Sequence, residues 1–221
     1  MSIESELVEK FEELKAREVS GAFNRSKHWA RFDNKKFDEK SLARFRSAGL
    51  SLGNDDVRDL AATRRLAESV VNTVGIDFLK RVGHRQNIGH SENVLKIDDI
   101  YCSWNDLHHV VWASQLAEVA TDQYMSYLEI GAGYGSFAAI LHRIYRFRRM
   151  VFVDLPEGLL QTAYYLKKSF PNLILVFDAI GFENLDHDES YAVFLTPDAD
   201  LDLIHFDLVV NARSFSEMRE N

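Results

Sequence analysis

Two kinds of apolar pattern divide this chain of 221 residues. In its N-terminal part, apolar side chains recur at the three- and four-residue spacing of α-helices. This spacing predicts helical stretches at 3–18, 54–83 and 105–120. Leu7, Phe11 and Leu14 form the apolar stripe of the first stretch, and Asn54 can cap the start of the second. A loop rich in Gly, His and Asn, residues 83–93, precedes the third.

The pattern changes after the third helix, where short apolar runs alternate with helical segments. The runs predict strands at 127–130, 150–154, 173–178, 191–196 and 207–212, with helices at 136–147 and 157–170. Strands that are apolar on successive residues are buried on both faces, as in parallel sheets covered by helices. We therefore expect a helical N-terminal region, residues 1–100, followed by a Rossmann-like, doubly wound α/β domain, residues 101–221.

Composition and charge narrow the class of protein. Hydrophobic residues make up 46% of the chain, which is enough for a packed core. The net charge is −8, and no Lys or Arg lies between Asp178 and Asp207, so a nucleic-acid partner is not expected. That acidic stretch is either a solvated loop or a rim that attracts a cationic cofactor.

Other residue types exclude further classes. The sequence shows no apolar run long enough to span a membrane and no secretory signal, so we expect a cytoplasmic protein. The single cysteine, Cys102, excludes an internal disulfide and a Cys-rich zinc site. No spacing of His, Asp and Glu marks a metal site, although a divalent ion is not ruled out.

The most informative stretch is YLEIGAGYGSFAAIL, residues 127–141, where a predicted strand runs into a predicted helix. Gly131, Gly133 and Gly135 allow backbone angles that other residues avoid, and they remove side chains that would keep a ligand from the main chain. Ser136 can cap the helix or donate to the ligand. In α/β sheets ligands bind at this end of the strands.

The acids around these glycines suggest which nucleotide binds. A dinucleotide fingerprint, G-x-G-x-x-G, needs Gly or Ala where Ser136 stands. Glu129 suits an ammonium group, Asp154 at the next strand tip suits ribose hydroxyls, and Asp178 suits an adenine amino group. Acids at neighbouring strand tips thus indicate S-adenosylmethionine. Each feature also has a plainer interpretation: a tight turn, a helix start in DLPEG, and an ordinary loop acid.

The chain resembles the class I S-adenosylmethionine-dependent methyltransferases over about residues 100–221. More narrowly, it is similar to a bacterial family of sugar O-methyltransferases. The resemblance is carried by LEIGAGYG at 128–135, VDLPEGLLQTAYYLKKSFPN at 153–172 and DLVVNARSFSEM at 207–218. It implies methyl transfer to a hydroxyl of a sugar or glycan precursor.

The resemblance also implies roles for particular residues. Glu129, Gly131, Gly133 and Gly135 would line the methionine and ribose part of the cofactor, Asp154 would take the ribose hydroxyls, Asp178 would lie near the adenine, and Asn211 near the methyl donor.

A hydroxyl is hardly ionised at neutral pH, so methyl transfer to it benefits from a general base. His108 and His109, near the start of the helix before the first strand, are the best candidates. Each could equally be a satisfied or exposed structural histidine. Glu217 is a further candidate, although Ser214 and Glu217 also form the pattern of a helix capping box. His84 and His90, in the loop at 83–93, could contact substrate, and His205 is expected to be a surface-loop residue.

The family fold has seven strands, and the sequence ends shortly after the fourth main strand, at 207–212. We expect that the chain is truncated, that the uncovered strand pairs with another copy or a partner, or that the N-terminal helices cover it. Two other functions stay open: a catalytically inactive methyltransferase-like binding subunit, and an NAD(P)-dependent oxidoreductase.

Overall fold

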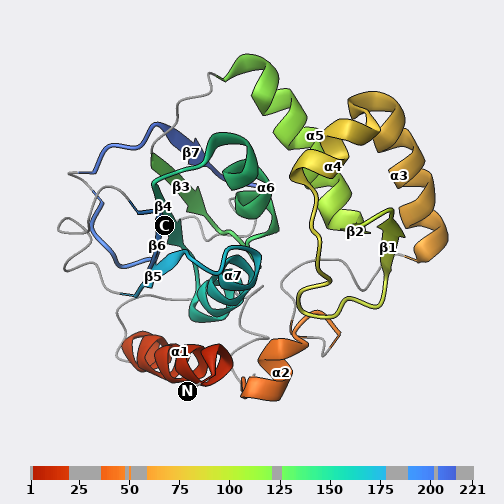
Figure 1. Ribbon diagram of the computed structural model, residues 1–221. Coiled ribbons are helices and arrows are strands. Elements are labelled where there is room, and N and C mark those ends of the chain that lie inside the picture. Colours follow the sequence, from red (N-terminus) through yellow and green to blue (C-terminus); the bar gives the residue numbers. More distant parts are fainter. Residues whose placement is uncertain are drawn as a thin grey trace.

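A five-stranded parallel sheet forms the centre of the protein (Figure 1). The computed structural model describes residues 2–19, 36–47, 50, 59–120, 126–177, 189–201 and 204–212. The strands are β3 (Ser126–Ile130), β4 (Arg149–Val153), β5 (Ile174–Val176), β6 (Tyr191–Leu195) and β7 (Leu208–Val210), in the order β5-β6-β4-β3-β7. Helices alternate with the strands along the chain, so the predicted α/β class with a Rossmann-like parallel sheet is confirmed.

Helices α6 (Ser136–Tyr145) and α7 (Pro156–Ser169) share one core with one face of the sheet, and α5 (Trp104–Val119) packs on α6. Tyr127, Phe152 and Phe194 point from the strands into this core, and their rings pack on one another or on neighbouring aromatic rings. The alternate strand residues face the other side. There, in the described part of the chain, they pack with a separate apolar group from the segment before β7 (Ala199, Leu201, Ile204 and Phe206).

The N-terminal elements are α1 (Ile3–Val19), α2 (Glu39–Ala43), α3 (Leu60–Val74), α4 (Ile76–Val82) and a hairpin of β1 (Val94–Ile97) with β2 (Ile100–Ser103). In Figure 1, α1 lies beside α7, while α3, α4 and the hairpin gather on the far side of α5. Leu7, Phe11 and Leu14, the predicted stripe of α1, are all buried. Within the described ranges, no helix combines the length and hydropathy needed to cross a membrane.

The predicted single helix at 54–83 is wrong in one respect, because it is two helices. Gly75 ends α3 and begins α4 with φ of +84°, a value that breaks a helix and that only glycine adopts readily. Asp59 caps α3, and its Oδ1 accepts a hydrogen bond of 2.6 Å from the N–H of Ala62. The predicted cap Asn54 lies outside the described residues.

The strand tips that carry the predicted acids are not all neighbours in the sheet. The strand before Asp178, β5, pairs with β6, and β6 lies between β5 and β4. The strand beside β4 on this side is β6, and the residue after β6 is Thr196, whose hydroxyl donates to Asp198. Asp178 and Glu217 themselves lie outside the described residues.

Candidate functional site

The candidate site lies where β3 ends. The chain continues from β3 through α6 to β4 on one side, while the later strand β7 pairs with β3 on its other side. This change of direction is the switch point at which open α/β sheets bind their ligands. Residues 131–135 form the connection, and the Asn211 Nδ2 donates 2.7 Å to the Ile130 carbonyl, which ties the end of β7 to it. Asn211 therefore lies beside the end of β3, and its proximity to a methyl donor stays a prediction.

The three glycines of this loop all have left-handed backbone angles. The φ values are +75° at Gly131, +63° at Gly133 and +82° at Gly135. A Cβ atom on Gly135 would lie 2.9 Å from Cγ2 of Thr162 in α7, so this glycine also allows close packing. A Cβ on Gly133 would meet no atom within 4 Å. Gly133 therefore presents bare main chain to open space, which is what the approach of a ligand requires.

Asp154 follows β4 and turns its carboxylate toward the glycine loop. One oxygen accepts from the Gly133 N–H at 3.1 Å, and the other accepts from the Leu155 N–H at 2.7 Å. Asp154 is not the cap of α7, because the N-cap residue is Leu155; its carboxylate binds the Gly133 N–H of the loop instead. Its role as a ligand acid stays a prediction. Gly158 makes room for this carboxylate, since a Cβ there would lie 2.4 Å from Asp154 Oδ2.

Glu129 is buried, with 1% of its surface exposed, and accepts a 2.7 Å hydrogen bond from the hydroxyl of Tyr127. Burial raises the pKa of Glu129 to about 8; repulsion from Asp154 adds to this, and the bond from Tyr127 opposes it. A cation brought to this carboxyl would favour its ionised form. Glu129 is therefore a buried acid that is largely protonated at pH 7 in this structure, and its predicted pairing with an ammonium group stays a prediction.

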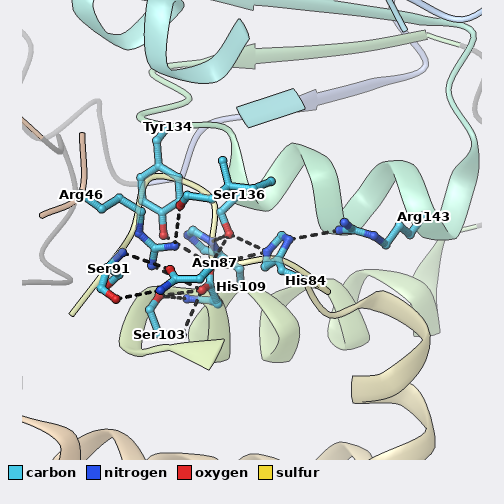
Figure 2. A network of polar contacts seen from close by, with 11 residues as sticks. Arg46, His84, Asn87, Ser91, Ser103, His109, Tyr134, Ser136 and Arg143 are labelled. Carbon is cyan, nitrogen blue, oxygen red and sulfur yellow. Dashed lines mark hydrogen bonds and ion pairs between the residues drawn. The ribbon is translucent and has the colours of Figure 1, made fainter. Parts of the chain in front are cut away.

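A second group of polar side chains, not predicted as a set, includes Arg46, Ser103 and Ser136, which Figure 2 shows close together. The carboxylate of Asp106 in α5 joins them. Its Oδ2 accepts from Ser103 Oγ at 2.7 Å and from the Ser103 N–H at 3.0 Å, as a capping box for α5. Its Oδ1 accepts from Ser136 Oγ at 2.6 Å and Tyr134 OH at 3.3 Å. The Arg46 guanidinium lies 3.6 Å from Oδ2.

Two imidazoles meet the same serine. His84 Nε2 and His109 Nδ1 lie 3.1 and 3.2 Å from Ser136 Oγ, and Figure 2 shows both rings turned toward it. His84 is 2% exposed, so the predicted substrate contact by this residue is not supported by its burial. His109 is half-buried, whereas His108 packs against Trp104 and Trp112. Of the two predicted bases, His109 thus contacts Ser136, the residue that directly follows the glycine loop.

Burial and charge set the protonation states of this network. Burial would raise the pKa of Asp106, but the Arg46 guanidinium and the Ser136 hydroxyl hold it well below its usual range. Burial lowers the pKa of His84 to about 3 despite the attraction of Asp106, so His84 is neutral at pH 7. The ionised Asp106 and the cationic Arg46 thus form a buried pair.

Part of this network could have been read from the sequence. Ser103 and Asp106 have the Ser-x-x-acid spacing of a capping box, which marks the true start of α5 one residue before the predicted 105. Nothing local indicates that the same carboxylate binds Ser136, thirty residues later, or Arg46.

The fold and the loop define the class of protein: an α/β protein with a parallel sheet and a glycine loop of left-handed backbone at its switch point. In comparisons with protein families, curated proteins and solved structures, nothing matches this chain. In the described ranges, His, Cys, Asp and Glu form no cluster of three or more that could hold a metal ion.

Proposed function

We propose that this chain binds S-adenosylmethionine at the carboxyl end of β3 and transfers its methyl group to a hydroxyl of a small molecule. The observation that carries the proposal is the bare main chain at Gly133, which binds the Asp154 carboxylate, with the Glu129 carboxyl close enough to Asp154 for the two to repel each other. A cofactor with an ammonium group, a sulfonium and a ribose finds a chemically suitable partner for each charged or polar part there.

The acceptor class rests on the resemblance of residues 153–172 and 207–218 to sugar O-methyltransferases. A sugar or glycan precursor is therefore the first acceptor to test.

The bound cofactor would supply a methyl group already activated by the positive sulfur. In the transfer, the acceptor oxygen forms a bond to the methyl carbon, the carbon–sulfur bond breaks, and its electron pair stays on sulfur as a neutral thioether. The hydroxyl proton passes to a base, for which His109 is the candidate next to the loop. The protein contributes alignment of the two reactants and a base in place.

Cofactor binding is tested by calorimetric titration and melting shift with S-adenosylmethionine, S-adenosylhomocysteine and NAD⁺. Gly133→Ala puts a methyl group into the open space over the loop, and we expect at least tenfold weaker binding of the first two ligands. Gly75→Ala is the matched control, because Gly75 also has a left-handed φ, +84°, and also has nothing within 4 Å of a Cβ. Gly75→Ala is at least as demanding a control for backbone strain, because Gly75 also has ψ of +150°, in a region that is essentially restricted to glycine.

Three results would contradict the proposal. A response to NAD⁺ alone would favour the oxidoreductase. Equal loss of binding in Gly133→Ala and Gly75→Ala would show a stability effect rather than a site. Tight binding of S-adenosylhomocysteine without transfer of labelled methyl to any sugar or glycan pool would favour the non-catalytic binding subunit.

A further inference from the structure

The hydroxyl of Ser136 stands at the meeting point of one carboxylate and two imidazoles. It donates to Asp106 Oδ1 at 2.6 Å, and it lies 3.1 Å from His84 Nε2 and 3.2 Å from His109 Nδ1. Ser136 is 1% exposed and is the first residue of α6, directly after Gly135. A hydroxyl has one proton to donate and two lone pairs to accept with. The position of that one proton therefore decides what both imidazoles must do.

The proton of Ser136 belongs to Asp106. An ionised carboxylate can only accept, and the pKa of Asp106 lies well below its usual range because Arg46 and the hydroxyl of Ser136 outweigh the effect of burial. The contact between Ser136 and Asp106 is also the shortest that the hydroxyl makes. Toward both imidazoles Ser136 is consequently an acceptor.

Arg143 fixes the tautomer of His84 independently. A guanidinium has no acceptor, so the 3.2 Å contact of Arg143 Nη1 with His84 Nδ1 requires that Nδ1 accept. Neutral His84 then carries its proton on Nε2 and donates it toward Ser136. This agrees with Ser136 being an acceptor.

The same reasoning gives the opposite tautomer for His109. Its Nδ1 is the atom that faces Ser136, so Nδ1 carries the proton, and Nε2 is the basic nitrogen of the neutral ring. The ring is also packed between Trp112 and Phe137, with centroids at 5.5 and 5.3 Å. His109 is thereby held in one orientation and one tautomer.

We propose that Ser136 and Asp106 are positioning residues that keep the proton of neutral His109 on Nδ1, so that Nε2 is the nitrogen that takes the proton of the acceptor hydroxyl. The tautomer follows from the hydrogen bonds together with the ionised state of Asp106. The use of Nε2 in catalysis rests in addition on the proposed methyl transfer. The balance is simple: the acceptor O–H proton bonds to Nε2, and His109 becomes an imidazolium.

The tautomer is measured in the full chain by long-range ¹H–¹⁵N correlation of the histidine rings at pH 7.5. We expect neutral His109 to show a protonated Nδ1 and His84 a protonated Nε2; His109→Gln identifies the His109 signals. In Ser136→Ala, His109 should shift toward the Nε2–H tautomer that a free imidazole prefers. Ser114→Ala is the matched control. Ser114 is in α5, the helix of His109, and among the described contacts its hydroxyl donates to the Val111 carbonyl.

Activity gives the second readout. His109→Gln should lower kcat about 10²–10⁴-fold, and Ser136→Ala about tenfold or more, with the Kd for S-adenosylhomocysteine changed less than about threefold. An Nε2–H tautomer in unmodified His109, or an unchanged tautomer in Ser136→Ala, would overturn the positioning role. A changed tautomer with unchanged kcat would overturn the catalytic use of Nε2. Failure of the proposed function would instead appear as no cofactor binding by the unmodified chain.

Discussion

Two buried carboxyl groups near the glycine loop differ sharply in acidity, and the difference comes from their neighbours. Asp106 has a guanidinium and several donors around it, so it is ionised; Glu129 has one hydroxyl and a nearby acid, and its pKa rises to about 8. The sequence predicted that Glu129 lies in the strand before the glycine loop, whereas its affinity for a cation stays a prediction. It could not predict Asp106, because its partners Arg46 and Ser136 come from distant parts of the chain.

The pKa of Glu129 makes a prediction about stability and pH. The folded value of about 8 exceeds the unfolded value of 4.5, so Glu129 costs stability as pH rises between them. His84 acts oppositely below pH 6.5, because its folded value is about 3. Between pH 6.5 and 8, Glu129 should therefore lower the unfolding free energy of the unmodified chain by up to about 1.4 kcal/mol per pH unit. In Glu129→Gln this loss of stability with rising pH should be absent.

Urea unfolding at several pH values gives the slope of unfolding free energy against pH for the unmodified chain and for Glu129→Gln, and the two slopes are compared. Glu118→Gln, at an exposed position of α5, is the control and should keep the slope of the unmodified chain. Parallel slopes for Glu129→Gln and the unmodified chain would show that Glu129 is ionised throughout this range.

At the scale of the elements, the local apolar pattern was sufficient to predict most helices and strands of the α/β part. The strand predicted at 127–130 is β3 at Ser126–Ile130, and the helix predicted at 157–170 is α7 at Pro156–Ser169. Apolar period and glycine position determine such elements locally. The position of β6 between β4 and β5 is not local, because it depends on which strand edges pair after folding. The β1–β2 hairpin was missed although Asp98 and Asp99 separate its two short runs.

The first turn of α7 offers a test of how an element positions a site residue. Alanine is favoured over glycine in a helix by about 1 kcal/mol, yet in Gly158→Ala the new Cβ would lie 2.4 Å from Asp154 Oδ2. We expect this variant to bind S-adenosylhomocysteine about tenfold more weakly without gaining the stability of a helical alanine. In an Asp154→Asn background it should weaken binding no further. Additive losses in calorimetric titration would separate Gly158 from Asp154.

At the scale of the whole molecule, the N-terminal elements share one apolar core with the sheet. That core extends from Leu7 in α1 to Phe194 in β6. Lys15 of α1 lies 3.3 Å from the buried Glu157 of α7. Arg46 reaches Asp106 and also lies over the ring of Tyr134 in the glycine loop, 4.9 Å from its centre. Residues far apart along the sequence thus build the surroundings of the loop together.

The buried pair of Arg46 and Asp106 predicts how strongly these parts depend on each other. Arg46→Met leaves a buried carboxylate without its cation and should cost about 3–5 kcal/mol of unfolding free energy. Combined with Asp106→Asn, the total loss should be clearly smaller than the sum of the two single losses. Urea midpoints of the four proteins measure the coupling. Simple additivity would mean that the two side chains stabilise the fold independently.

The attachment of β7 has a consequence for biosynthesis. Ser126 at the start of β3 exchanges hydrogen bonds with Asp207, 81 residues later, and Asn211 closes on Ile130 across the same separation. Residues 207–211 must therefore be synthesised and leave the ribosome before β7 can pair with the second edge of β3. Until then the nascent chain exposes an unpaired edge of β3. Chaperones, or strands of other chains, would bind at this edge.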